Sequence, residues 1–376
     1  MTHSVNGVPG VAAALGTVSQ PVTAWTAFGQ DVAFGGDHVT DNMLFASGGV
    51  SALNQKHVAY MRGSHTQWSL AQILSPPAEF NEHNYFGDVL DLDRYHLRQL
   101  AVGCYGCNAS HAYSGSVFVY EATSPDAKKW TQTALLSPPS WRYELGRFQM
   151  SIHKDKILAS VAHAPALSAA NTVVNTVLFQ KGVDGWSYMQ EFSLGADPAR
   201  DDTTRAEVYD DTIVISGVSN IGHSGGFYGK GTVRVFYPNT KEFAGPKSKP
   251  APVQWSVQQV LISPLAGATT AALAASADLQ FGQSISIDGD RMFISENSAQ
   301  AGYIYERQST AGLWSVQQKL TLTAAAVESQ VSGSHVGVVS TTGIDVLDET
   351  QRWDCLVVSI EDHFNDGWDS ANLVVD

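Results

Sequence analysis

Short apolar runs separated by turn residues recur along the whole chain. The clearest set spans 281–320, with two runs on either side of Asp288-Gly289-Asp290, a third run after a loop of small polar residues, and a fourth that begins at Trp314. Asp-Gly between two such runs is a strong hairpin signal, because primed turns need positive φ angles. The pattern predicts four antiparallel strands in about forty residues, which is the size of one propeller blade.

The same succession of runs recurs six times. Three units open on a Phe-Gly pair at Phe28, Phe86 and Phe281, the third unit opens on Leu145-Gly146, and the other two lack the pair. Tryptophans mark the expected start of each fourth strand, namely Trp68, Trp130, Trp186, Trp255, Trp314 and Trp353. Units that bury one face against a neighbour are expected to stack radially into an all-β propeller of four-stranded antiparallel blades. The aromatic ring of each pair should wedge between blades, and its glycine should allow close backbone approach.

These motifs resemble the FG-GAP repeats of integrin alpha-chain head propellers. The resemblance rests on FGQ twice, FGD once, the IDGD turn and the W-S-V-Q-Q run twice. It implies a β-propeller, usually of seven blades although six are visible here, that serves outside the cell as a recognition or adhesion module without catalysis. We therefore divide the chain into an N-terminal segment at 1–27, a propeller at 28–353 and a small module at 354–376. The N-terminal segment can supply the closing outer strand of the last blade or part of a seventh blade.

Two observations concern metal ions. The calcium loop of integrin blades, D-x-N-x-D-G-x-x-D, is absent from the turns, so the resemblance brings no calcium into the blades. The segment at 354–376 resembles the first hairpin of a small Asp-Gly-Trp β-module, and we expect the natural polypeptide to continue beyond it. Four of its side chains can offer oxygens to calcium or can simply cap a tight turn, and these are Asp362, Asn365, Asp366 and Asp369. No other cofactor is expected.

Composition and charge exclude several classes of partner. The chain has 376 residues, of which 44% are hydrophobic and 15% charged, and this composition suits a large strand-and-turn protein. A net charge of −14 argues against nucleic acid and anionic membrane surfaces. No run of about twenty apolar residues exists, so direct membrane insertion is not expected. Residues 1–15 lack Lys and Arg and make a poor signal peptide, but the family resemblance still favours a secreted or cell-surface location.

Cys104 and Cys107 form a C-Y-G-C run. A redox pair should lie at a helix N-terminus, and a zinc site should have a second pair of ligands, but neither feature is present. A small loop-closing disulfide is therefore favoured over free thiols. The adjoining Asn108-Ala-Ser sequence predicts glycosylation at Asn108, which is consistent with a secreted and exposed loop.

The loops between second and third strands are long in the first four units, at 48–56, 104–114, 162–174 and 219–230. In a propeller such loops rise on one face around the central channel, where ligands normally bind. Their aromatic and hydrogen-bonding side chains suit a sugar or a protein surface, although solvated loops also carry such residues. The candidate ligand-binding residues are Tyr105, Asn108, His111, Tyr113, His163, His223, Tyr228 and Lys230.

No catalytic motif stands out in the chain. It contains no H-E-x-x-H, no G-x-S-x-G and no phosphate-binding loop. The leading hypothesis is a non-enzymatic extracellular recognition, adhesion or scaffold propeller that binds protein or glycan through its long loops. One alternative is a propeller carbohydrate-active enzyme, a lyase or hydrolase that uses loop His and Tyr side chains as base and acid. Another is a structural subunit that self-assembles into a surface filament.

Overall fold

A computed structural model of the chain describes residues 31 to 321, except for internal gaps. The gaps are 37–41, 51–54, 65–66, 81–84, 94–97, 108–113, 124–128, 140–141, 163–173, 194–200, 220–230, 240–253, 268–280, 297–300 and 309–311. The described residues contain twenty β-strands and two short 3-10 helices, η1 (Ala78–Phe80) and η2 (Pro264–Gly267). None of them belongs to a helix long and apolar enough to span a membrane.

The strands form five four-stranded sheets, each an antiparallel meander, which we call blades 1 to 5 in chain order. Blade 1 contains β1 (Val32–Gly36), β2 (Asn42–Val50), β3 (Gln55–Ser64) and β4 (Gln67–Leu74). Blade 2 contains β5 (Phe86–Leu92), β6 (Gln99–Cys104), β7 (Ser116–Ala122) and β8 (Trp130–Leu136). Blade 3 contains β9 (Met150–His153), β10 (Lys156–Ala162), β11 (Val174–Gly182) and β12 (Gly185–Phe192). Blade 4 contains β13 (Asp201–Tyr209), β14 (Thr212–Ser219), β15 (Thr232–Pro238) and β16 (Trp255–Ile262). Blade 5 contains β17 (Phe281–Asp288), β18 (Arg291–Glu296), β19 (Ala301–Glu306) and β20 (Ser315–Thr321).

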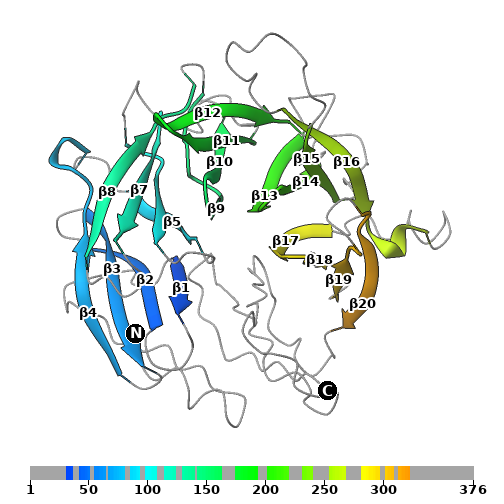
Figure 1. Ribbon diagram of the computed structural model, residues 1–376, viewed down its shortest axis with the longest axis horizontal. Coiled ribbons are helices and arrows are strands. Elements are labelled where there is room, and N and C mark those ends of the chain that lie inside the picture. Colours follow the sequence, from blue (N-terminus) through cyan, green and yellow to red (C-terminus); the bar gives the residue numbers. More distant parts are fainter. Residues whose placement is uncertain are drawn as a thin grey trace, which may run out of the picture.

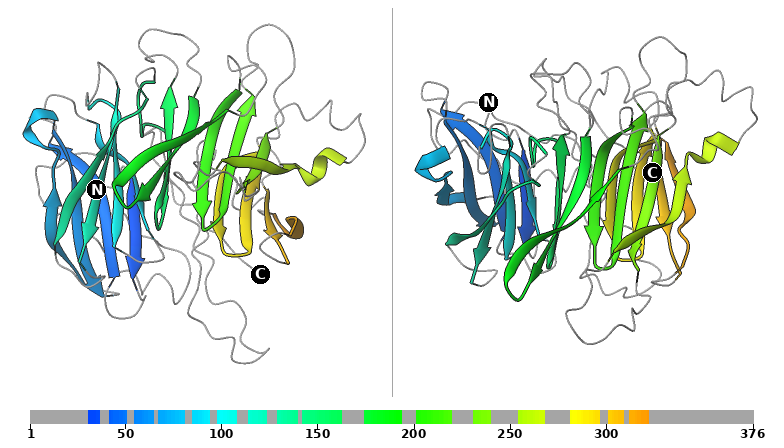
Figure 2. Two further views of the ribbon diagram at one scale, coloured as in Figure 1. Left: turned by 45° about the horizontal axis from the view of Figure 1, so that its top comes forward. Right: turned by 90° about the horizontal axis from the view of Figure 1, so that it is seen from above.

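The blades are arranged radially, as the sequence predicts. Figure 1 shows the first strand of each blade toward the centre and the fourth strand at the periphery. Figure 2 shows the strands running between two faces that carry the connections. The chain is therefore an all-β propeller, and five of its expected blades lie among the described residues. The sixth unit, the segment 1–27 and the module at 354–376 lie outside them.

Burial along the strands explains why the blades stack. The second strand of blade 3, β10, is buried at all seven positions, because both of its faces meet neighbouring blades. The outer strand β8 instead alternates, with Trp130 and Leu136 buried and the residues between them more exposed. The second strand of blade 3 is therefore buried on both faces, whereas the outer strand of blade 2 is buried mainly at its two ends.

The hydrophobic core consists of separate clusters between neighbouring blades. One cluster joins blades 1 and 2 and includes Phe45, Tyr60, Phe86 and Trp130. Similar clusters join blades 2 and 3, blades 3 and 4, and blades 4 and 5. Phe86 and Phe281 are both fully buried within such clusters, which confirms the predicted position of the Phe-Gly pair at blade junctions.

In the two described Phe-Gly pairs, the glycine lies against the preceding blade. Gly87 has a φ of +85°, and a methyl group on it would lie 2.8 Å from Cγ2 of Val58 in blade 1. Gly282 has a φ of +89°, and its methyl group would lie 2.8 Å from Val233 in blade 4. Both the backbone conformation and the close approach therefore require glycine.

Polar side chains also connect the innermost strands. The backbone N–H of Leu90 donates to Asp31 over 2.6 Å, and that of Ile152 donates to Asp91 over 2.7 Å. One junction further, the N–H of Val208 donates to the Ser151 hydroxyl over 3.1 Å. Each bond crosses from one blade to the next, so side chains at the inner edge of one blade satisfy backbone donors on the innermost strand of the following blade.

One expected loop is wrong. The segment 48–56 is mainly strand, because Gly48 pairs with His57, Gly49 with Lys56 and Val50 with Gln55. Only 51–54 separate β2 from β3. Two adjacent glycines normally weaken a strand, but here pairing with β3 outweighs that tendency.

Candidate functional site

The residues that flank Phe86-Gly87 and Leu145-Gly146 come together between blades 1, 2 and 3. Tyr85 and Asp88 flank Phe86-Gly87, and Glu144 and Arg147 flank Leu145-Gly146. Their contacts also involve Lys56 of β3, Tyr105 after β6, and Phe148. We call this set the flanking cluster, and its members are Lys56, Tyr85, Asp88, Tyr105, Glu144, Arg147 and Phe148.

Aromatic rings and cations are layered in the flanking cluster. The rings of Tyr85 and Tyr105 stack with centroids 3.9 Å apart and an interplanar angle of 27°. The guanidinium carbon of Arg147 lies 4.9 Å from the Tyr105 centroid and 4.8 Å from the Phe148 centroid. The Lys56 ammonium lies 5.6 Å from the Tyr85 centroid. Tyr85 and Phe148 are each 40% exposed, so flat aromatic surface faces solvent beside these cations.

The charges of the flanking cluster are balanced in two ion pairs. Lys56 bonds to the Asp88 carboxylate, and Arg147 Nη1 lies 2.5 Å from Glu144 Oε2. The two carboxylates are the more buried members, with side-chain exposures of 11% for Asp88 and 5% for Glu144. Because each pair is internally neutral, the site has no excess charge of either sign.

Burial changes the proton affinity of two groups in this cluster. Burial raises the pKa of Asp88, although the nearby Lys56 and Arg147 charges act in the opposite direction. Burial likewise raises the pKa of Tyr105, and its hydrogen bond with Tyr85 adds to the increase. Tyr105 is therefore a neutral hydroxyl throughout the physiological range, and Asp88 takes up a proton more readily than an ordinary aspartate.

A disulfide holds the turn that carries Tyr105. Cys104 and Cys107 are bonded to each other, as the sequence predicts, and both are fully buried. The N–H of Cys107 donates to the carbonyl oxygen of Cys104 over 3.1 Å, and Ser116 donates to the Cys107 carbonyl over 3.3 Å. The bridge and these bonds restrain both ends of the turn on either side of Tyr105.

Of the predicted ligand-binding residues, Tyr105 is the one that the described part of the chain includes. Seven others lie outside it, namely Asn108, His111, Tyr113, His163, His223, Tyr228 and Lys230. Asn108 as a glycosylation site is among these. The proposed metal ligands Asp362, Asn365, Asp366 and Asp369 also lie outside the described residues, which themselves contain no group of three or more metal-ligating side chains.

Sequence reasoning missed six members of the flanking cluster. A local signal existed, because four of them stand directly beside a Phe-Gly or Leu-Gly pair, at Tyr85, Asp88, Glu144 and Arg147. Because each of these two pairs packs against the preceding blade, the residues next to it in sequence also lie at the blade junction. Lys56 and Phe148 carry no such signal.

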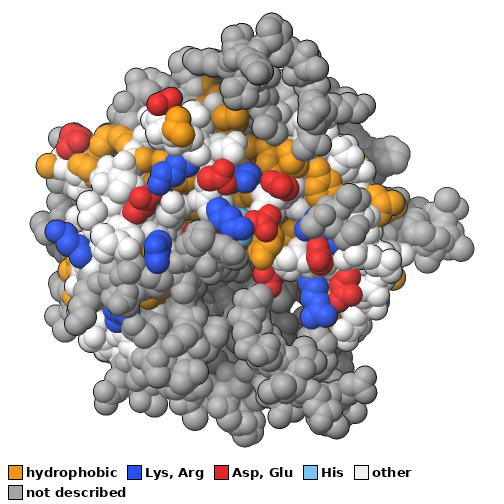
Figure 3. Space-filling view, in the orientation of Figure 1, with side chains coloured by type: hydrophobic (Ala, Val, Ile, Leu, Met, Phe, Trp, Pro, Cys, Tyr) orange, Lys and Arg blue, Asp and Glu red, His pale blue; other side chains and the backbone are white. Residues whose placement is uncertain are grey.

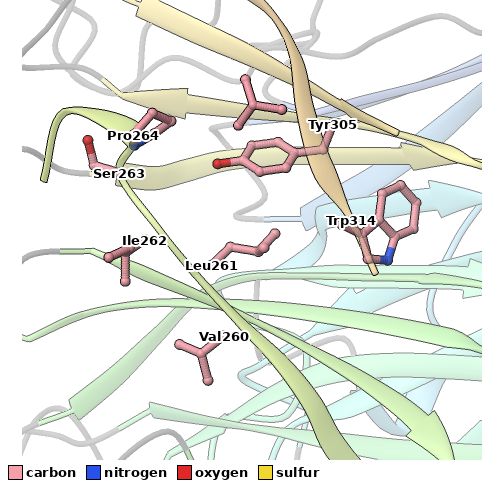
Figure 4. A pocket seen from close by; sticks show the side chains of 8 residues that line it. Val260, Leu261, Ile262, Ser263, Pro264, Tyr305 and Trp314 are labelled. Atoms are coloured by element: carbon pink, nitrogen blue, oxygen red, sulfur yellow. The ribbon is translucent and has the colours of Figure 1, made fainter. Parts of the chain in front are cut away.

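A hollow lies between blades 4 and 5. It has a volume of about 360 Å³ and is shown in Figure 4 with side chains from β16 and blade 5 around it. Its lining is Val260, Leu261, Ile262, Ser263, Pro264, Tyr305, Trp314 and Val316. The two short helices differ. After blade 1, η1 places Phe80 edge-on against Phe118, whereas η2, which follows blade 4, has no aromatic residue. The lining has no carboxylate, amine, imidazole or guanidinium group, so the hollow is apolar and is a weaker candidate for chemistry than the flanking cluster.

The surface around the ring centre is mixed in charge. Figure 3 shows Lys and Arg side chains next to Asp and Glu side chains on one face, with apolar side chains between them. No single sign dominates the described part of that face, although the whole chain carries a net charge of −14. The excess acidic charge is therefore not concentrated at the visible centre of this face.

Comparisons with known proteins show no family. No family model and no curated protein matches the chain in sequence, so the FG-GAP resemblance stays a prediction. Similar solved structures include a functionally unknown protein from Desulfotomaculum acetoxidans, with a TM-score of 0.43, 10% identity, and coverage of 82% of this chain and 74% of that one. Another is an alpha-L-arabinanase from Penicillium chrysogenum, with a TM-score of 0.42, 9% identity, and coverage of 79% and 83%. Likenesses at this level carry no argument about what this chain binds or catalyses.

Proposed function

We propose that the flanking cluster binds an uncharged carbohydrate outside the cell. The observation that supports this proposal is the stacked Tyr85–Tyr105 pair beside two internally neutral ion pairs. A sugar ring has a face of C–H groups that packs on an aromatic ring, and an edge of hydroxyls that bonds to charged or polar groups. Balanced charges favour a neutral sugar over a polyanion. The Cys104–Cys107 disulfide agrees with an oxidising, secreted setting.

Binding to polysaccharides tests this proposal. We would compare neutral polymers, such as dextran, galactan and arabinan, with polygalacturonate and heparin by affinity electrophoresis. Tyr85→Ala should weaken binding of a neutral polymer about tenfold or more, because an exposed aromatic anchor is lost. Tyr188→Ala is the matched control, because Tyr188 is 39% exposed but lies on the outer strand of blade 3. Absence of neutral binding, or equal binding by both variants, would contradict the proposal.

A second candidate function is cleavage of the bound glycan. Two carboxyl groups, Asp88 and Glu144, lie around one guanidinium, Arg147, which pairs with Glu144 and acts on the Asp88 charge. Burial raises the pKa of Asp88, as an acid catalyst of glycoside hydrolysis needs, while Glu144 pairs as a carboxylate. The sequence-based expectation of no catalysis therefore remains a prediction to be tested.

New reducing ends, measured after incubation with each neutral polymer, decide between binding and cleavage. If the protein is an enzyme, Asp88→Asn and Glu144→Gln should lower the rate at least about a hundredfold while binding persists. If polymer binds to the wild type but no new ends appear over days, the protein is a recognition module. Adhesion and filament assembly remain alternatives that would require binding of protein or of a second copy.

A further inference from the structure

Three blade junctions share one hydrogen-bonding device. The side-chain amide of Gln72 donates to the Trp130 carbonyl over 3.0 Å and accepts from the Trp130 N–H over 2.8 Å. Gln190 makes the same two bonds to Trp255, at 3.0 and 2.9 Å, and Gln259 makes them to Trp314, at 2.9 and 2.8 Å. Each glutamine lies on the outer strand of one blade, and each tryptophan begins or directly precedes the outer strand of the next. We call this arrangement the glutamine clasp.

A β-bulge places the glutamine. The outer strand of each of the five described blades carries one bulge. The residue after it stands four positions beyond the tryptophan of its own blade, at Gln72, Ala134, Gln190, Gln259 and Gln318. The extra residue twists the strand locally and re-aims the following side chain. A carboxamide carries one donor and one acceptor, so it pairs with a main-chain N–H and C=O as a neighbouring strand would.

The clasp depends on which residue stands after the bulge. Blade 2 has Ala134 at the position, and alanine has no side-chain amide. Blades 2 and 3 are instead joined near their outer strands by an ion pair between Glu121 and Lys181, at 2.6 Å. A glutamine after the bulge is therefore the sequence mark of a clasp to the following blade.

Gln318 has that mark but no clasp among the described residues. It stands after the bulge of β20, opposite Ile304, as Gln259 stands opposite Val235. The three clasping glutamines are half-buried, whereas Gln318 is exposed. Blade 5 is the last described blade. In Figure 1 the described blades form an incomplete ring, with blade 1 at one end and β20 of blade 5 at the other. The outer edge of blade 5 thus presents a preformed site for polypeptide main chain.

We propose that the occupant of this site is the main chain at Trp353 of the same molecule. Trp353 is the next expected outer-strand tryptophan after Trp314. The first three strands of blade 5 and the connections up to Trp314 take 33 residues, 281–313. The 31 residues between β20 and Trp353, 322–352, must also include the connection from β20, so we expect shorter loops there than in blade 5. The segment is long enough for three strands and too short for a second unit, so the clasp fixes a sixth blade in register against blade 5.

Cysteine cross-linking in the full chain tests this pairing. In a Cys355→Ser background, Gln318→Cys with Trp353→Cys should form a disulfide within one molecule, with a yield similar to that of Gln259→Cys with Trp314→Cys. Gln317→Cys with Trp353→Cys is the negative control, because Gln317 is the extra residue of the bulge. The proposal is overturned if the 259–314 pair closes and the 318–353 pair does not, or if the 318–353 bond joins two molecules.

Amide hydrogen exchange provides a second measurement that keeps Trp353. Gln318→Ala should speed exchange of the Trp353 amide roughly fivefold to tenfold, since one of its hydrogen bonds is lost. Gln259→Ala should do the same to the Trp314 amide, and Gln317→Ala should change neither. An unchanged Trp353 rate in Gln318→Ala, with the expected change at Trp314 in Gln259→Ala, would overturn the proposal.

Discussion

At the residue scale, glycine at the blade junctions serves two physical needs at once. Gly282 is in the left-handed region, at φ +89°, and a methyl group on it would lie 2.8 Å from both Ser216 Cβ and Val233 Cγ2. Gly289 in the hairpin turn is also left-handed, at φ +58°, but it has open space around it. An alanine at Gly289 would therefore test the cost of the left-handed backbone alone. An alanine at Gly282 would add the cost of the steric contact with blade 4.

We predict that Gly282→Ala destabilises the protein more than Gly289→Ala. Both substitutions cost roughly 1–2 kcal/mol for a left-handed alanine. Gly282→Ala should cost roughly 1–3 kcal/mol more, because blade 4 must move to admit the methyl group. Guanidinium unfolding curves of the two variants check this. Equal losses of stability would mean that the junction is loosely packed.

The buried His153 affects how the stability of the protein depends on pH. It is buried at the β9 end, stacks on Tyr209 with centroids 4.5 Å apart, and lies 3.1 Å from Asp210 and 4.0 Å from Asp93. Burial lowers the pKa of His153 below 6.5, although both carboxylates oppose the change and Lys154 adds to it. The imidazole is therefore neutral in the folded protein at neutral pH.

We predict that this histidine makes stability fall on mild acidification. Below about pH 6.5 the unfolded chain takes up a proton at His153 that the folded protein does not, so the unfolded state is favoured as pH decreases. The free energy of unfolding of the wild type should therefore drop more steeply between pH 7 and 5 than that of His153→Gln. Asp210 does not interfere, since its pKa is lowered from 3.8. Parallel curves would show that His153 titrates alike in both states.

At the element scale, the outer strand does more than close a blade. Its bulge places one side chain against the main chain of the next blade, as Gln259 does at Trp314. The inner strands are tied separately, as Asp91 ties Ile152. Two junctions have both kinds of tie. Blades 1 and 2 are joined through Asp31 and Gln72, and blades 3 and 4 through Ser151 and Gln190.

We predict that Gln259→Ala destabilises the protein by roughly 1–3 kcal/mol, because two hydrogen bonds are lost and main-chain groups of Trp314 are left without them. Gln258→Ala is the matched control. The exposed Gln258 side chain donates to the half-buried Ser256 hydroxyl of the same strand, so its loss should stay within roughly 0.5 kcal/mol. Thermal unfolding of both variants measures the difference. If the two behave alike, the clasp contributes nothing measurable.

At the scale of the whole molecule, four described junctions each carry an apolar cluster. A repeat array unfolds together when the interfaces between repeats are strong relative to the repeats themselves. A single blade of this propeller exposes both faces when its neighbours leave, so it should not persist alone.

We therefore predict a single cooperative unfolding transition for the propeller. Far-ultraviolet circular dichroism reports strand content, and fluorescence reports tryptophans that lie in every described blade, from Trp68 to Trp314. The two signals should give coincident midpoints in guanidinium. Midpoints that differ between the signals would mean that some blades unfold before others.

Some features were accessible from sequence because they depend on neighbours along the chain. The Asp288-Gly289 hairpin, the tryptophan at the start of each outer strand and the buried Phe-Gly pair all appear where the pattern places them. Pairing of Gly48 and Gly49 was missed, because a weak strand former takes its state from the strand opposite. Of the flanking cluster, only Tyr105 was predicted as a site residue. That prediction rested on its position in a long loop and not on the residues that it contacts.

The sequence by itself determined the strand pattern, the repeat and the all-β class, because strand periodicity and turn chemistry act over a few residues. Only the tertiary structure decided which residues meet across blades. Tyr105 contacts Tyr85 and Arg147, and Gln72 contacts Trp130, 58 positions away. Such contacts depend on the angle at which one blade packs on the next and on bulges that re-aim single side chains. Local marks such as the residues beside a Phe-Gly pair do not specify that packing angle, so the contacts of the candidate site were decided only when the blades were placed side by side.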